Sequence, residues 1–139
     1  VCGYTPFDGA EYDYYTTTKG VLEKVKAHVG DVDFAVQPEI LSLLSSGNFG
    51  RYADEKGEMK VCFISNNDIT GGNSGSAMFN SKGELLGLAF DGNWEAMGSD
   101  ILYEPKMQRT IGVDVRYILF MIEKYGKAGN LIQELNILN

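Results

Sequence analysis

Histidine and cysteine, two side chains that commonly bind metal ions in proteins, are scarce in this sequence of 139 residues. There is one histidine, His28, and there are two cysteines, Cys2 and Cys62, which are not spaced as metal ligands. The sequence therefore predicts no metal site, and no cofactor is expected. A disulfide between the two cysteines stays open, because sequence does not establish that they are close. Two unpaired, partly buried thiols are the favoured interpretation.

Clustered positive charge and long apolar runs are also missing. The 12 Lys and Arg residues are scattered and are outnumbered by 19 Asp and Glu residues, so the formal net charge is −7. This pattern argues against a nucleic-acid partner. No apolar run is long enough to span a bilayer, so no membrane partner is expected. The first residues, Val1-Cys2-Gly3-Tyr4, lack the charged start and apolar segment of a signal peptide, as a fragment or a mature chain also would.

The residues that are present indicate one globular, β-rich domain. The length is that of a single domain, and 44% of the residues are hydrophobic, which is enough to form a core without metals. The 17 glycines lie between short apolar runs, a pattern typical of strands joined by turns. The predicted fold class is therefore mainly β with C-terminal helices (α+β).

The first sixty residues predict a hairpin and short helices. Residues 4–16 are rich in Tyr and Thr around a turn signal at residues 7–10, which indicates a hairpin or two extended pieces. A short helix is predicted over residues 21–27, and a second helix begins at Pro38 and ends at residues 45–48. Residues 51–58 are polar and are expected to form a loop.

Residues 60–90 predict strands on both sides of a loop. Residues 60–65 alternate and are rich in β-formers, whereas residues 66–76 are dense in Gly and Asn and lack an apolar period. Two strands follow, over residues 76–79 and 85–90, and a turn that includes Gly83 joins them. The second of these strands is expected to be buried.

The C-terminal part predicts one further strand and two helices. The strand contains Ile111, Val113 and Val115, which alternate with other residues. Asp114 or a neighbour then caps a helix whose apolar residues are Ile118, Leu119, Ile122 and Tyr125. Gly126 and Gly129 are expected to end this helix. Asn130 and Gln133 resemble a capping box, and the final helix is expected to bury Leu131, Ile132 and Leu135.

The loop Thr70-Gly71-Gly72-Asn73-Ser74-Gly75-Ser76 has the features that a serine nucleophile needs. Glycines let the chain turn tightly where a Cβ atom would clash. The backbone N–H groups of Gly72 and Ser74 can then point the same way and form an oxyanion hole, which stabilises the charge that develops in acyl transfer. A glycine-rich surface turn with an incidental serine is the alternative. The strand pair after the loop makes that alternative the weaker one.

The loop resembles the Gly-Asp/Asn-Ser-Gly-Gly/Ser motif of chymotrypsin-fold peptidases. The wider sequence resembles the bacterial dipeptidyl-peptidase 7 and 11 family over nearly the whole chain. A distinctive stretch of this likeness is Asp91-Gly92-Asn93-Trp94-Glu95. This stretch lies within residues 87–96, and the other stretches that carry the likeness are residues 12–17, 49–53, 66–76, 104–105, 108–111 and 113–120.

The resemblance implies a secreted or periplasmic serine exopeptidase that removes dipeptides from the N-termini of peptides and forms homodimers. It also implies a double β-barrel of chymotrypsin type with an added helical domain. Residues 1–60 would then be an N-terminal segment with a hairpin and short helices. Residues 61–139 would be the nucleophile-bearing part of the second barrel, with C-terminal helices.

The resemblance also assigns roles to individual residues. Ser74 becomes the nucleophile, and Asp91 a candidate for binding the free α-amino group of the substrate. Gly92 would line the pocket for the residue before the scissile bond, where members that select Asp or Glu carry an arginine. A glycine there implies bulky apolar residues. A simple turn at Asp91-Gly92 is the plainer interpretation. Trp94 would wall the substrate cleft, although a packed Trp is the more common case.

A serine nucleophile also needs a base and a carboxylate that orients it, and the neighbourhood of Ser74 supplies neither. His28 lies near the end of a short helix pattern and is expected to be a surface or interface residue. Asp68 is expected to hold the loop by accepting backbone N–H bonds. The resemblance implies a protein several times longer, with its histidine and aspartate before Val1. This chain alone is therefore expected to be inactive.

Two other functions stay open from the sequence. One is an HtrA-like serine endopeptidase, which has a similar loop and hairpin but matches the stretch from Asp91 to Glu95 and the C-terminal helices less well. The other is a non-catalytic β-barrel that only binds a partner.

Overall fold

The computed structural model describes residue 11, residues 13–98 and residues 101–138. The chain divides into two compact units, each built from two separate segments. The first unit comprises residues 1–16 and 61–115, and the second comprises residues 17–60 and 116–139. The predicted division between residues 60 and 61 falls where the chain passes from the second unit to the first. As a domain boundary it stays a prediction.

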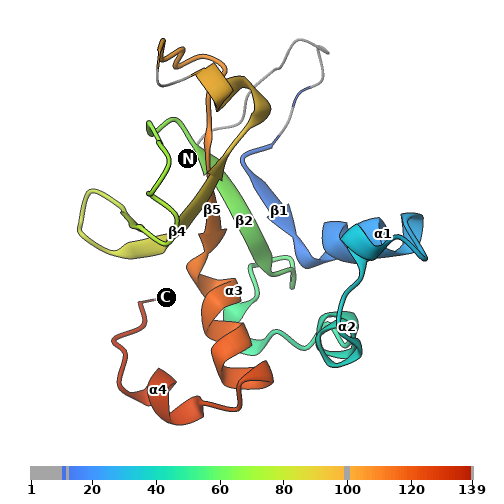
Figure 1. Ribbon diagram of the computed structural model, residues 1–139. Helices are drawn as coiled ribbons and strands as arrows, with labels where there is room; N and C mark the ends of the chain where they lie inside the picture. The colour runs from blue at the N-terminus through green and yellow to red at the C-terminus, as the bar shows by residue number, and fades with distance from the viewer. Residues whose placement is uncertain (1–10, 12, 99–100, 139) are drawn as a thin grey trace. The chain divides into compact units, whose positions relative to one another are not determined.

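A five-stranded sheet organises the first unit (Figure 1). The strands lie in the order β1-β2-β5-β4-β3, and the pairs β2–β5, β4–β5 and β3–β4 are antiparallel. Their bounds are Tyr15–Thr17 (β1), Lys60–Ser65 (β2), Ala77–Phe79 (β3), Leu85–Gly92 (β4) and Thr110–Asp114 (β5). The short 3-10 turn Trp94–Gly98 (η3) follows β4. Together with the C-terminal helices, this sheet confirms the predicted combination of β-structure and helices.

Two glycines let an aromatic ring pack directly on the sheet. The ring belongs to Phe63, which is buried in the core. A Cβ atom at Gly87 would lie 2.8 Å from Phe63 Cε1 and 2.0 Å from the Val113 carbonyl oxygen. A Cβ atom at Gly112 would lie 3.0 Å from Phe63 Cζ and 2.7 Å from Met78 Sδ. Both positions therefore require glycine, because contacts this short force a neighbour to move.

The burial of strand β5 does not follow its apolar residues. In β5 the buried residues are Thr110, Gly112 and Asp114, whereas the apolar Ile111 and Val113 are half-buried. The inward face of this strand thus carries the polar Thr110 and Asp114.

Strand β4, which was predicted to be buried, is not buried throughout. Leu85, at its first position, and Phe90 are 42% and 43% exposed. Phe90 lies where the pairing with β5 shifts register between Ala89 and Asp91. An extra residue in a strand leaves the regular pleat, so its side chain does not follow the inward alternation.

The second unit is helical. Its helices are Thr18–Ala27 (α1), Pro38–Ser45 (α2), Val115–Phe120 (α3, which begins at the end of the first unit) and Gly129–Gln133 (α4). A π-helical turn, Met121–Tyr125 (η4), follows α3 directly, and 3-10 turns span Val32–Phe34 (η1) and Gly50–Tyr52 (η2). The helices predicted over residues 21–27 and from Pro38 are confirmed. The predicted loop over residues 51–58 instead starts within η2, where Tyr52 is buried.

The C-terminal helices differ from the prediction in three details. Gly126 ends the π-helical turn as expected, but Gly129 begins α4 instead of ending the preceding helix. Ala128 is the N-cap of α4 and makes no side-chain cap bond, so the predicted capping box is wrong. Ile132 is buried, but Leu131 is about half exposed, because so short a helix buries only a narrow face, and Leu135, also about half exposed, lies beyond the end of α4.

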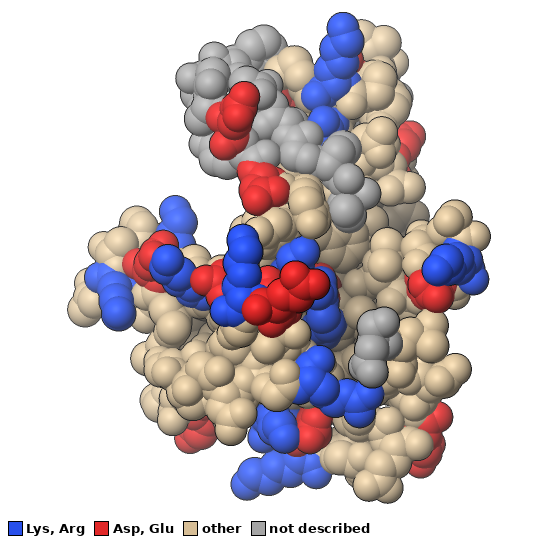
Figure 2. Space-filling view, turned by 180° about the vertical axis from the view of Figure 1, so that it is seen from behind, with Lys and Arg blue, Asp and Glu red and all other residues tan. Residues whose placement is uncertain are grey.

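The rest of the chain agrees with the sequence in outline. The predicted hairpin over residues 4–16 lies mostly outside the described residues, and Tyr15 starts β1. Charged side chains of both signs are interspersed on the surface in Figure 2. In the described ranges, no helix is both long and apolar enough to cross a membrane.

An aromatic cluster with one buried hydroxyl forms the core of the second unit. Phe120 packs edge to face against Phe49 and Tyr52, at centroid distances of 5.7 and 6.0 Å. The Tyr52 hydroxyl donates to a carboxylate oxygen of Glu123 at 2.5 Å. Burial, and then this bond, raises the pKa of Tyr52 to about 12. The hydrogen bond from Lys124, and after it the bond from Tyr52, lowers the pKa of Glu123 below its ordinary value of 4.5.

We expect Tyr52→Phe to lower the free energy of unfolding of the chain by about 1–2 kcal/mol, because a hydrogen bond to a charged acceptor is lost. The lowered pKa of Glu123 means that this bond stabilises the fold fully above pH 4.5 and loses its effect as the pH falls through the folded-state value. Urea unfolding at several pH values tests this. Tyr125→Phe is the control, since Tyr125 bonds to Gln37 at an exposed position. A Tyr52→Phe deficit that does not shrink in acid would contradict the assignment.

Candidate active site

Two successive tight turns form the loop that carries Ser74. The Asn73 N–H donates to the Thr70 carbonyl at 3.2 Å, and the Ser76 N–H donates to the Asn73 carbonyl at 2.9 Å. Gly72 and Gly75 occupy the third positions of these turns with φ angles of 98° and 87°. Glycine adopts such angles without steric cost, as type II turns require. Ser74 is thereby placed at the exposed second position of the second turn.

The end of this loop is fastened to β4. The Gly75 N–H donates to the Ala89 carbonyl at 2.7 Å, and the Ala89 N–H donates to the Ser76 carbonyl at 2.9 Å. Ala89 is buried, so water does not compete for these bonds. The position of Ser74 is therefore set by the strand that also carries Asp91 and Gly92.

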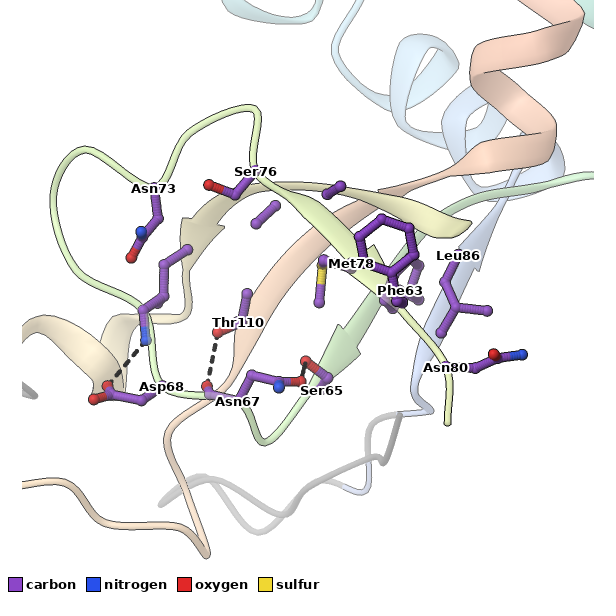
Figure 3. A pocket seen from close by; sticks show the side chains of 14 residues that line it. Phe63, Ser65, Asn67, Asp68, Asn73, Ser76, Met78, Asn80, Leu86 and Thr110 are labelled. Atoms are coloured by element: carbon purple, nitrogen blue, oxygen red, sulfur yellow. Dashed lines mark hydrogen bonds between the residues drawn. The ribbon is translucent and has the colours of Figure 1, made fainter. Parts of the chain in front are cut away.

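The start of the loop is held by polar side chains (Figure 3). Thr110 Oγ1 donates to the Asn67 carbonyl, and the Ser65 hydroxyl donates to Asn67 Oδ1, both at 2.7 Å. Asp68 accepts the Ile69 N–H at 2.9 Å, which agrees with its expected role in the loop. Figure 3 looks into a cavity of about 440 Å³ between these residues and the apolar side chains Phe63, Met78 and Leu86.

The backbone N–H groups of Gly72 and Ser74 are available to bind a further group. Its hydroxyl donates weakly to the Phe90 carbonyl, at 3.4 Å. Within the described ranges, neither the Gly72 N–H nor the Ser74 N–H donates a hydrogen bond to another residue. Two free donors beside a hydroxyl are what an oxyanion hole requires. The assignment of Gly72 and Ser74 to that role stays a prediction.

A second cavity brings three of the predicted site residues together. Its volume is about 270 Å³, and Ser74, Asp91 and Gly92 all line it. Apolar side chains complete the wall, namely Ile69, Phe90, Ala96 and Met97. The cavity thus combines a serine hydroxyl, a carboxylate and an apolar wall.

Asp91 and Gly92 belong to strand β4, so the interpretation of this pair as a simple turn is wrong. Gly92 pairs with Thr110 across the sheet. The exposed Asp91 carboxylate accepts the Gly92 N–H at 2.8 Å. A Cβ atom at Gly92 would lie 3.0 Å from Ala96 Cβ and 3.6 Å from Ile69 Cγ2. Any larger residue at this position would therefore reach into the apolar wall.

Other candidate residues lie elsewhere. His28 belongs to the second unit, where its half-buried ring stacks on Phe34 at a centroid distance of 4.0 Å. Among the described residues, no histidine or carboxylate bonds to the Ser74 hydroxyl. Trp94 is 82% exposed and does not line the cavity, so the interpretation as a packed residue is wrong.

Among the described residues, neither a cysteine nor a metal-ligand cluster contributes to the cavity that contains Ser74. Cys62 is a half-buried free thiol whose pKa is raised by burial, and Cys2 lies outside the described residues. Across the part of the chain that the structure describes, no cluster of His, Cys, Asp and Glu is arranged to hold a metal ion.

Sequence reasoning missed the residues that shape the cavity. Ile69 and Ala96 form its wall, and Asn93 holds the end of β4 in place. A small apolar residue such as Ala96 carries no chemical signature in sequence. For Asn93, the available signal was a polar side chain shortly after a predicted strand, where it can bond to the neighbouring backbone.

Comparison with known proteins gives a consistent result. The model of the family described as Peptidase S46 matches residues 1–137. The chain is 61% identical over 135 residues to a dipeptidyl-peptidase 7 of Porphyromonas endodontalis, covering 97% of the chain and 16% of that protein. It is 45% identical over 137 residues to an Asp/Glu-specific dipeptidyl-peptidase of Porphyromonas gingivalis, covering 99% of the chain and 19% of that protein. The chain thus spans less than a fifth of the length of these relatives.

The fold is also found in a solved structure. The crystal structure of Porphyromonas endodontalis DPP11 in complex with the dipeptide Arg-Glu matches with a TM-score of 0.90 and 42% sequence identity. The match covers 96% of this chain and 19% of that one.

The φ angle of Gly72 predicts that its replacement is costly, whereas Gly71 beside it is tolerant. Neither position has an atom within 4 Å of an added Cβ, and only Gly72 has a positive φ. We expect Gly72→Ala to lower the free energy of unfolding by about 1–2 kcal/mol because the left-handed backbone is strained. Gly71→Ala should change it by much less. Urea unfolding of the two variants measures the difference. Equal losses of stability would show that the positive φ of Gly72 does not determine the cost of replacing it.

Proposed function

Because the chain belongs to the peptidase S46 family, we propose that it is part of a serine-type dipeptidyl peptidase with Ser74 as its nucleophile. The observation that carries the proposal is the cavity that Ser74, Asp91 and Gly92 share. Family membership favours this function over an HtrA-like endopeptidase and over a non-catalytic binding module, since the relatives reported above are named as dipeptidyl peptidases.

Peptide cleavage at this site starts with attack of Ser74 Oγ on the carbonyl carbon of the second substrate residue. The N–H groups of Gly72 and Ser74 hold the negative oxygen that forms, and the intermediate collapses to an acyl-enzyme as the amine leaves. Water then attacks the acyl-enzyme and frees the dipeptide. The hydroxyl must give up its proton during attack, so a base is required.

The base and its orienting carboxylate come from a part of the complete protein outside this chain. The Ser74 hydroxyl has only a weak bond to the Phe90 carbonyl, which is no proton acceptor at neutral pH. The relatives are more than five times longer than this chain, since it covers 16–19% of them. The chain alone is therefore inactive as a peptidase.

Asp91 restricts cleavage to the N-terminus of a peptide. Its carboxylate is exposed and lines the same cavity as Ser74. An α-ammonium group bound there forms a charge-assisted hydrogen bond, which is strong when substrate covers it. We assign the carbonyl that Ser74 attacks to the second substrate residue, counted from the amino group bound at Asp91. The product of this assignment is a dipeptide.

Gly92 gives the site its preference for an apolar residue before the scissile bond. Ile69 and Ala96 lie beside it, Met97 lines the same cavity, and the described lining contains no Lys or Arg that could pair with an acidic side chain. The identity to dipeptidyl-peptidase 7, 61%, also exceeds the 45% identity to the Asp/Glu-specific relative.

The wider setting is part of the same proposal. The sheet of the first unit is part of the second barrel of a chymotrypsin-like double barrel, and the complete protein is a periplasmic or secreted homodimer. Exposed apolar side chains support a larger protein around this chain, among them Phe79, Met97 and Ile101, which are 59%, 74% and 93% exposed.

Labelling with a fluorophosphonate tests the nucleophile. We expect the complete protein to form an adduct on Ser74, located by mass mapping, and the 139-residue chain alone to form none. Ser74→Ala should abolish the adduct, whereas Ser76→Ala, two residues along the same loop, should retain it. Rapid labelling of the isolated chain would place a base inside it and refute the proposed division of the site. His28 would then be the first residue to replace.

Replacement of Asp91 tests the recognition of the amino group. In the complete protein we expect Asp91→Asn to lower kcat/KM for peptides with a free N-terminus by roughly 10- to 100-fold, the effect of losing one charge-assisted bond. Asp68→Asn is the matched control, because the Asp68 carboxylate lies in the other cavity and bonds to the Ile69 N–H. Equal losses in both variants would exclude a specific role for Asp91.

A further inference from the structure

Asn93 is a buried polar residue that the proposed chemistry does not use. It follows Gly92 directly, is 9% exposed and lines the cavity that contains Ser74. A buried amide is costly unless its polar atoms are bonded, so the partners of such a residue indicate what it holds in place.

The side chain of Asn93 has a partner for each of its polar atoms. Oδ1 accepts the Arg109 N–H at 2.8 Å, and Nδ2 donates to the Met107 carbonyl at 2.8 Å and to Glu95 Oε2 at 2.9 Å. These contacts demand an acceptor on one side and two donors on the other. An amide satisfies them, whereas a carboxylate of the same shape would place an oxygen against two oxygens.

The backbone of Asn93 joins the two walls of the cavity. Its N–H donates to the Arg109 carbonyl at 2.9 Å, which extends the β4–β5 pairing one step beyond Gly92 and Thr110. Its carbonyl accepts the Ala96 N–H at 2.9 Å and so starts the turn η3. Asn93 therefore fixes Gly92 on one side and Ala96 on the other.

The partner of Asn93 is itself held firmly. The buried guanidinium of Arg109 donates to the carbonyls of Pro105, Lys106 and Gln108 at 2.9, 3.1 and 2.8 Å. The segment from Pro105 to Arg109, to which Asn93 bonds, is thus held in a turn by hydrogen bonds of its own. The room between Gly92 and Ala96 is small, since a Cβ atom at Gly92 would lie 3.0 Å from Ala96 Cβ. A small displacement of either wall changes which side chains fit.

We propose that Asn93 is a positioning residue that sets the width of the pocket for the substrate residue before the scissile bond. The inference rests on the proposed function, because it assigns this pocket to a peptide side chain. Among the described residues, Asn93 makes no hydrogen bond to the loop of Ser74. Its loss therefore changes the fit of the substrate and leaves the nucleophile in place.

The test compares substrates in the complete protein carrying Asn93→Asp. Dipeptide substrates with a chromogenic leaving group present Leu or Ala before the scissile bond, and the ratio of their kcat/KM values is measured. We expect this ratio to fall at least ~10-fold at neutral pH, a magnitude typical of a misfitted apolar pocket, with most of the change in KM. The ratio should recover in part as the pH is lowered, because a protonated carboxyl group can donate to the Met107 carbonyl.

Asn80→Asp is the matched control. Asn80 Nδ2 donates to Glu84 Oε2, and Oδ1 accepts the N–H groups of Lys82 and Glu84. The Asn80→Asp exchange removes an amide donor to a glutamate carboxylate, as the exchange at Asn93 does. Asn80 lies in the turn before β4 and does not line the Ser74 cavity. Its Leu-to-Ala ratio should equal that of the wild type.

The ratio does not depend on how much of the variant is folded. An unchanged ratio in an active Asn93→Asp protein overturns the inference. Where that variant gives no folded protein, Asn93→Gln, which keeps the donors and the acceptor one methylene further out, is measured instead. A ratio altered at least ~3-fold supports the inference, and an unaltered ratio overturns it. A wild-type protein that releases no dipeptides refutes the proposed function, and the inference falls with it.

Discussion

The backbone of Ala89 is the point on which the site depends. On one side its N–H and carbonyl groups bond to Ser76 and Gly75, and on the other it lies opposite Gly112 in the pairing of β4 with β5. The loop that carries Ser74 is thus attached to the strand that carries Asp91 and Gly92 immediately downstream. One short stretch of chain therefore sets the separation between the Ser74 hydroxyl and these two residues. A register shift at Phe90 adjusts that stretch without breaking the sheet.

The two units are stabilised in different ways. The second has an apolar, aromatic core that includes Leu44, Phe49 and Phe120. The first buries few large apolar residues and many polar ones, which are Ser65, Asn93, Gln108, Arg109, Thr110 and Asp114. Polar groups of this kind are directional, so they fix positions more narrowly than apolar packing does. Under the proposed function, the first unit holds a peptide in a defined geometry and gains from this directionality.

The sequence predicted the elements better than their environment. The bounds of β2, the helix from Pro38 and the loop around Ser74 follow from local patterns, and local structure is what such patterns report. The inward face of β5 did not follow, because Thr110 and Asp114 are buried by partners distant in sequence. Asp91-Gly92 has the composition of a turn, yet its pairing with Ile111 and Thr110 keeps it in a strand. The grouping of Ser74, Asp91 and Gly92 came from resemblance, whereas the roles of Asn93 and Ala96 required coordinates.

The pairing of β2 and β4 with β5 also orders events in time. Gly75 and Ser76 can pair with Ala89 as soon as the β3–β4 hairpin has formed, a contact between near neighbours in sequence. The wall at Asn93 waits for Arg109, and the pairing of Cys62 with Val113 requires closure of a long loop, which is slower. A nascent chain that ends before Arg109 therefore contains the serine turn but lacks the partner that holds Asn93 and the end of β4. The turn that carries Ser74 can thus form before the cavity wall beside Gly92 is fixed.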